Sequence, residues 1–177
     1  MTTRSASCLV AGAVGITMLV GVAMMAIAAI PQASGNACAL LSAQQVSTAL
    51  GVPVDEGQDE LQGQPQLCSW REHGKSGMTG QYLKLTLLTA QQYERPKAGP
   101  FAKGPENGIG DEAYWSYIQG IGYTLSVKKG SVYMRLQSRP IPDGMERHSD
   151  TPEERAKWDD KAKAVERAMA LSALTKL

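Results

Sequence analysis

The chain has 177 residues, which is enough for one domain with an apolar core. Its formal net charge is +1 at pH 7, which argues against a partner held mainly by charge, such as nucleic acid. The chain contains no motif that by itself names a reaction, a cofactor or a ligand.

Residues 1–35 have the pattern of an export signal. Arg4 precedes residues 8–30, which carry no charged side chain. A bilayer needs about 20 apolar residues, so both a cleaved signal peptide and an uncleaved signal anchor remain open. Small residues at 26–28 and 33–35 offer cleavage sites. Either outcome predicts that residues 36–177 lie on the periplasmic or extracellular side of the cytoplasmic membrane.

Two of the three cysteines lie in the exported part. An even number in an oxidising compartment indicates a disulfide, so we predict a bridge between Cys38 and Cys68, with two buried free thiols as the alternative. The bridge would close a loop of about 31 residues and stabilise the fold by roughly 3 to 4 kcal/mol. We do not expect a lipid on Cys38, because residues 35–37 lack the large aliphatic side chain usual before a lipidated cysteine.

A short helix is predicted directly after Cys38. Ser42 is a typical N-cap residue, Gln45 completes a capping box, and Gly51 ends the apolar pattern. Residues 53–65 are rich in Gly, Gln, Asp and Glu and are expected to form a loop.

Residues 67–71 and 81–88 are predicted strands. In the second, three leucines alternate with polar residues, which is the pattern of a half-buried strand. One face of this strand is therefore expected in the core and the other in solvent.

Residues 121–137 form the clearest predicted hairpin, with Lys129-Gly130 as a two-residue turn. The apolar pairs across it would be Val127 with Val132, Leu125 with Met134, and Tyr123 with Leu136. The opposite face is expected to be exposed and carries Thr124, Ser126, Lys128, Tyr133, Arg135 and Gln137.

A final helix is predicted from residue 152 onward. Thr151 and Glu154 form a capping box around a proline at the first helical position. Apolar residues follow at helical spacing, namely Trp158, Ala162, Val165 and Met169. We find no internal repeat and no second domain, so residues 36–177 are expected to form one domain.

Residues 108–113 have the spacing G-x-G-x-x-A together with two adjacent carboxylates. A dinucleotide fingerprint needs a strand before the first glycine and a helix after the last, whereas a loop precedes Gly108 and strand-like aromatics follow. Asp111 and Glu112 make a poor metal site, because adjacent strand residues point to opposite faces. We therefore predict a turn in which Gly108 and Gly110 adopt positive φ and the Asp111 side chain bonds the backbone two residues further along the chain.

The remaining candidates are histidines and tryptophans. His73 and His148 lie in polar stretches beside acidic residues, but no G-x-S-x-G motif accompanies them. Trp70 and Trp115 are candidates for lining a ligand groove, although tryptophan on a short strand more often fills a core.

The order of these elements resembles a broad group of small bacterial exported or lipoprotein-like domains of unknown function, of the kind common in actinobacteria. The likeness depends on a cysteine-led helix at residues 37–51, on Cys68-Ser69-Trp70, and on the G-x-G-D-x-A turn at residues 108–113. It implies a compact α+β domain with a cysteine bridge, and it brings no catalytic residues. Unlike many such proteins, the chain lacks a good lipidation motif and a late cysteine pair.

Taken together, these features predict an exported α+β domain in which an antiparallel β-sheet is packed by an N-terminal and a C-terminal helix. We expect a non-enzymatic binding module for a small ligand or another envelope protein, without cofactor or metal. Membrane contact is expected only through an uncleaved N-terminal segment. A cofactor-free exported hydrolase that uses His73 or His148, and a proteinaceous inhibitor of an exported enzyme, remain open alternatives.

Overall fold

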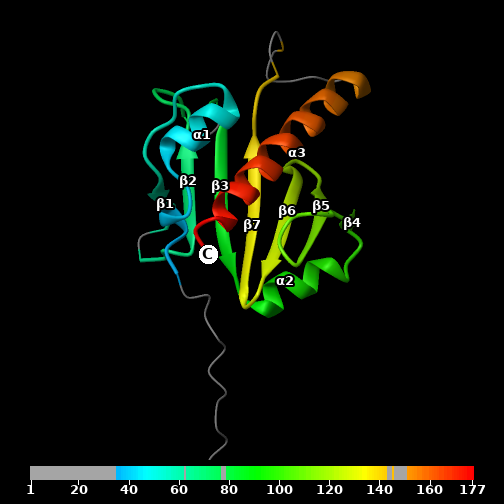
Figure 1. Cartoon of the computed structure of the whole chain (residues 1–177). Helices are drawn as coiled ribbons and strands as arrows, with labels where there is room; N and C mark the ends of the chain where they lie inside the picture. Colours follow the sequence, from blue (N-terminus) through cyan, green and yellow to red (C-terminus); the bar gives the residue numbers. More distant parts are fainter. Residues whose placement is uncertain (1–34, 62, 77–78, 143–144, 146–150) are drawn as a thin grey trace, which may run out of the picture. The chain divides into compact units, whose positions relative to one another are not determined.

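The computed structural model describes residues 35–61, 63–76, 79–142, 145 and 151–177 (Figure 1). Residues 1–34 of the predicted export signal, and His148, lie outside the described residues. All the described residues belong to one compact unit of the chain.

The strands that the structure describes form one seven-stranded sheet in the order β1-β2-β3-β7-β6-β5-β4, with every neighbouring pair antiparallel. The seven strands are β1 (Gln58–Asp59), β2 (Leu67–Arg71), β3 (Tyr82–Leu88), β4 (Ala102–Pro105), β5 (Glu112–Ile118), β6 (Gly122–Lys129) and β7 (Val132–Arg139). Of these, β2 and β3 have nearly the bounds predicted from the sequence.

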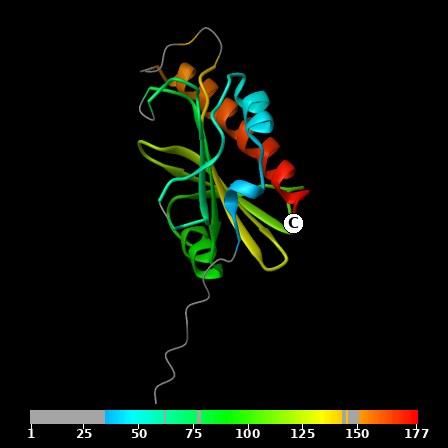
Figure 2. The same cartoon turned by 90° about the vertical axis from the view of Figure 1, so that its left-hand side faces the viewer.

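The helices pack on both faces of this sheet, as the edge-on view shows (Figure 2). The helices α1 (Ala43–Leu50) and α3 (Pro152–Leu174) cover one face, and α2 (Ala90–Lys97) lies on the other. A short 3-10 helix, η1 (Ala37–Ala39), precedes α1. The predicted α+β class, with an antiparallel sheet packed by an N-terminal and a C-terminal helix, is confirmed, and α2 is an addition that the sequence analysis did not predict.

Local signals in the sequence account for the ends of the two predicted helices. The Ser42 hydroxyl accepts the Gln45 N–H at 3.2 Å, and the Gln45 side chain accepts the Ser42 N–H at 2.9 Å, which is the predicted capping box. Gly51 ends α1 with a φ of 80°. Thr151 caps α3, whose first residue is a proline, as predicted.

The main core lies between the sheet and the pair α1 and α3. Leucines of β3 and apolar residues of β6 and β7 meet one another across the sheet and pack against α3. The fully buried members at the centre are Leu83, Leu85, Leu125, Val127, Met134 and Leu136, with Val165, Met169 and Ala170 from α3 above them.

The register of the β6–β7 hairpin differs from the prediction by two residues. Leu125 lies opposite Leu136 and Lys129 opposite Val132, so the turn is Gly130-Ser131 and the predicted Lys129-Gly130 turn is wrong. Side chains alternate between faces with a period of two, so a shift of two residues changes the partners and leaves each side chain on its predicted face.

The prediction that the other hairpin face is exposed is wrong for its centre. Ser126 is 0% exposed and Thr124 is 2% exposed. The polar side chains of this face indicated exposure to solvent, because α2, which covers the face, was not predicted. In the structure, Tyr93 of α2 packs against Tyr133 of this face, and the Arg135 side chain lies over Ser126.

Candidate binding site

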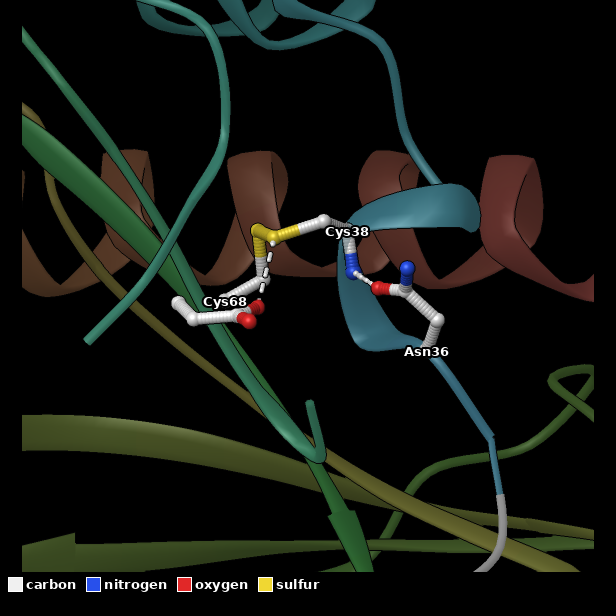
Figure 3. Close-up of a disulfide and its surroundings, with 4 residues drawn as sticks. Asn36, Cys38 and Cys68 are labelled. Carbon is white, nitrogen blue, oxygen red and sulfur yellow. Dashed lines mark hydrogen bonds between the residues drawn. A yellow bond between two sulfur atoms is a disulfide. The ribbon is translucent and has the colours of Figure 1, made fainter. Parts of the chain in front are cut away.

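The predicted disulfide is present, and it joins η1 to β2 (Figure 3). The Cα atoms of Cys38 and Cys68 are 5.1 Å apart, and Cys68 is 0% exposed. The Asn36 side chain accepts the Cys38 N–H at 2.9 Å and so orders the residue that carries the bridge. The alternative of two free thiols is therefore wrong. This half-buried bridge is a structural link between elements.

The G-x-G-D-x-A segment docks against the β6–β7 turn. Gly108 and Gly110 have φ values of 78° and 62°. The Asp111 N–H donates to the Lys128 carbonyl at 2.9 Å, and its carboxylate accepts the Gly130 N–H at 2.7 Å. That hydrogen bond, together with the neighbouring lysine side chain, lowers the pKa of Asp111. The segment thus holds the hairpin turn in place.

Neither tryptophan lines a groove. Trp70 is 1% exposed and Trp115 is 8% exposed, and both belong to the main core. The Trp115 indole N–H donates to a Glu106 carboxylate oxygen at 2.7 Å, which satisfies its polar atom at the edge of the core.

His73 is paired with Asp55 at the surface. Its Nδ1 lies 2.6 Å from the Asp55 carboxylate, and this hydrogen bond and the adjacent negative charge raise the pKa of His73. Among the described residues, no hydroxyl or thiol is hydrogen-bonded to this ring. In the same part of the chain, no three His, Cys, Asp or Glu side chains group together in a way that could hold a metal ion.

An open cavity of about 400 Å³ lies where β2 and β3 meet the start of α2. It lies on the α2 side of the sheet, because Leu67 and Thr86 are cross-strand partners whose side chains point away from the main core. We call it the β2–β3 pocket. Its lining residues are Gly63, Gln64, Gln66, Leu67, Thr86, Leu87, Thr89 and Gln92.

Backbone and cap hydrogen bonds hold two walls of the β2–β3 pocket. At the start of α2, the Thr89 N–H donates to the Gln92 side-chain carbonyl at 2.8 Å, and the Gln92 N–H donates to the Thr89 hydroxyl at 3.2 Å. On the other wall, the Leu87 N–H donates to the Gln66 carbonyl at 2.7 Å. The pocket is therefore built from ordered backbone and presents neutral amide and hydroxyl side chains.

Arg135 of β7 is not one of the lining residues, but it is next to two of them. It is the cross-strand neighbour of Thr86, and its guanidinium donates to the Gln92 carbonyl at 3.4 Å. Its Nε–H donates to the Ser126 hydroxyl at 3.3 Å. Both acceptors are neutral, and no carboxylate forms an ion pair with Arg135 among the described residues.

Further basic side chains follow on the same face. Glu60 accepts from Arg71 at 2.8 Å and from Lys84 at 2.6 Å. Further along the same face, at the pairing of β3 with β7, the Gln137 side-chain amide donates to the Tyr82 hydroxyl at 2.8 Å. The Arg139 guanidinium lies 4.8 Å from the centre of the Tyr82 ring. The surface beside the pocket is therefore rich in cations and in hydrogen-bond donors.

None of the pocket residues, nor Arg135, was predicted from the sequence as a binding candidate. The T-x-x-Q spacing of Thr89 and Gln92 is a readable capping signal. It places a helix start, but the meeting of that helix with residues 63–67 depends on the tertiary fold.

A buried carboxyl lies on the opposite side of the sheet. Glu166 of α3 is 0% exposed, and its Oε1 accepts from the Ser138 N–H at 2.8 Å and from the Ser138 hydroxyl at 3.0 Å. Burial raises the pKa of Glu166 well above its ordinary value, because water no longer solvates the charged form. It lies in the main core and takes no part in the pocket.

Comparison with known proteins gives no match to a family, to a curated protein or to a solved structure. Within the described residues, no helix is long and apolar enough to cross a membrane. The functional proposal therefore depends on the sequence and structure of this chain, without support from a relative.

Proposed function

We propose that the protein is an exported, non-enzymatic binding module that holds a small polar ligand in the β2–β3 pocket. The Cys38–Cys68 bridge supports an oxidising compartment, because disulfides persist outside the cytosol. The export-signal pattern of residues 1–35 points the same way.

The single observation that carries the proposal is an open cavity of about 400 Å³ lined largely by neutral polar residues. Sites for small ligands commonly have volumes of about 300 to 1,000 Å³ and use a few placed polar groups to fix orientation. Gln64, Gln66 and Thr86 offer donors and acceptors, and none of the three titrates near neutral pH. Such a lining suits the recognition of amide or hydroxyl groups.

Amide-resolved NMR of the exported domain tests this proposal. N-acetyl-dialanine amide and N-acetylglucosamine are two neutral polar probes that would be added in turn. We expect at least one to shift the resonances of Gln66, Thr86 and Gln92. A matched variant, Thr86→Trp, should fill the pocket and abolish these shifts while the rest of the spectrum is retained. Shifts confined to other surfaces, or shifts unchanged in the variant, would contradict a ligand site here.

A second candidate is the cofactor-free hydrolase, which one contact favours. The 2.6 Å contact of His73 Nδ1 with Asp55 is the arrangement that orients a histidine base, although no nucleophile accompanies it among the described residues. Hydrolysis of generic ester and glycoside substrates should be compared between the wild type and His73→Ala. A rate that depends on His73 would support the hydrolase and overturn the binding-module proposal.

A further inference from the structure

Arg135 is a cation whose ion-pair partner is absent from the described part of the fold. A guanidinium carries five N–H donors, and the two hydrogen bonds to Ser126 and Gln92 use two of them. Both acceptors are neutral, so neither neutralises the charge. Partly buried cations are usually paired, because desolvation of an uncompensated charge is unfavourable.

The two hydrogen bonds also fix the orientation of Arg135. The Nε–H is directed to the Ser126 hydroxyl, which is fully buried, and one terminal nitrogen is directed to the backbone of a pocket residue. The remaining donors lie at the free end of the guanidinium, whose planar fork matches the two oxygens of a carboxylate. At 3.3 and 3.4 Å these hydrogen bonds are long, and they favour this orientation of the side chain, which lessens the entropy lost on binding.

Nearby acidic residues form ion pairs with other cations and do not neutralise the charge of Arg135. Glu60, whose N–H donates to the carbonyl of the pocket residue Leu67, accepts from both Arg71 and Lys84. On the other side of α2, Lys97 is paired with both Glu94 and Glu112. Beside β2 and β3, two cations share the single carboxylate of Glu60, so Arg135 adds to an excess of positive charge there. Beyond α2 the balance is reversed, because Lys97 is shared by two carboxylates.

We infer that the ligand of the β2–β3 pocket carries a carboxylate, which pairs with Arg135, next to an amide- or hydroxyl-bearing body that fills the glutamine- and threonine-lined cavity. This inference depends on the proposed function, since it names the chemical class of ligand for the same pocket. A small acidic peptide or an acylated amino acid has this chemistry.

Two probes that differ only in charge test the inference, namely N-acetyl-dialanine as the free acid and as its C-terminal amide. Each is added at about 10 mM, where a ligand with a millimolar Kd occupies most sites. We expect the acid to bind about 10-fold or more tightly than the amide, because a charge-assisted hydrogen bond is stronger than a neutral one. Arg135→Gln should remove this difference, whereas Lys128→Gln, which deletes a cation of the same face that has no contact with the pocket, should preserve it.

The possible outcomes separate the two proposals. Equal binding of acid and amide within the pocket, unaffected by Arg135→Gln, would overturn the carboxylate inference and leave the pocket as a binding site. No shift of pocket resonances with either probe would overturn both. Inorganic phosphate is the third arm, and a phosphate effect that requires Arg135, without an effect of the carboxylate, would contradict the assignment of a carboxylate.

Discussion

At the scale of single residues, Gly110 shows how a turn can be fixed by a backbone contact. Its φ is 62°, which favours glycine, and a Cβ at this position would clash with the Lys128 carbonyl oxygen. A backbone atom of a paired strand cannot move away without disturbing the sheet. Gly110 therefore serves both the local turn and the contact with the β6–β7 hairpin.

Replacing Gly110 with Ala should destabilise the fold by more than about 2 kcal/mol, because left-handed strain and the steric clash add together. Gly120 has a φ of 80°, but a Cβ added there would meet nothing within 4 Å outside the adjoining residues, so it provides the matched control. Gly120→Ala should cost only about 1 kcal/mol. Chemical denaturation of both variants measures the difference, and equal losses would show that the contact with Lys128 is unimportant.

Glu166 gives a pH-dependent prediction. Its folded-state pKa is raised above the ordinary value of 4.5, so the folded protein holds this proton more tightly than the unfolded chain does. The wild type should therefore lose stability as the pH rises from about 4.5 toward the raised pKa. Glu166→Gln keeps an oxygen for Ser138 and cannot ionise, so it should become more stable than the wild type as the pH rises.

Denaturation midpoints of the wild type and Glu166→Gln, compared from pH 4 to pH 8, check this sign. Asp160→Asn, which removes an exposed acid from the same helix, is the control and should show no comparable trend. Parallel curves for the wild type and Glu166→Gln would mean that the buried carboxyl does not retain its proton in the folded state.

At the scale of the elements, the β6–β7 hairpin and α2 show which features local sequence determines. The alternation of apolar and polar residues correctly predicted that Leu125 and Val127 lie on the core face. This prediction requires only that successive side chains of a strand point to opposite faces. The register was readable in part, because Gly130-Ser131 is also a dipeptide typical of two-residue hairpin turns, and Lys129-Gly130 was the wrong choice between the two. In the structure, the Asp111 carboxylate accepts the Gly130 N–H and holds this turn from outside the hairpin.

The helix α2 was missed for a related reason. It has eight residues, contains Pro96, and buries only Tyr93, so it lacks a periodic apolar face. Its stability comes from packing on Leu88, Tyr114 and Tyr133, which are distant in sequence from one another. Because the β2–β3 pocket needs α2 as a wall, the candidate site could not be predicted from the sequence either.

The two faces of β6 provide a test at this scale. Leu125→Ala should cost about 2 to 5 kcal/mol because it leaves a cavity in the main core. Ser126→Ala should cost about 1 kcal/mol, since the Arg135 Nε–H loses its acceptor. Ile121→Ala, at a turn residue that is 44% exposed, is the control and should change stability by less than about 0.5 kcal/mol. A silent Leu125→Ala substitution, measured by denaturation, would contradict the observed packing.

At the scale of the whole molecule, the disulfide joins the start of the α+β domain to its sheet. Cys38 lies in η1, and Cys68 lies in β2 between β1 and β3, at a sequence separation of 30 residues. The bridge therefore restricts the unfolded chain over η1, α1 and the loop that leads into the pocket.

Breaking the bridge should lower the free energy of unfolding by roughly 3 to 4 kcal/mol in the chain-entropy model. Denaturant midpoints with and without reductant measure this loss. A double variant, Cys38→Ala with Cys68→Ala, should match the reduced wild type and should not respond to reductant. If reductant leaves the wild-type midpoint unchanged, the bridge does not stabilise the fold.

The proposal that one face of the sheet binds a ligand is tested most directly by a crystal structure of residues 36–177 with N-acetyl-dialanine bound as the free acid. We predict that the carboxylate of the probe accepts hydrogen bonds from the Arg135 guanidinium, and that its amide groups lie against Gln66, Thr86 and Gln92. A probe seated elsewhere on the molecule, or an empty β2–β3 pocket under saturating conditions, would contradict the assignment of this face as the binding site.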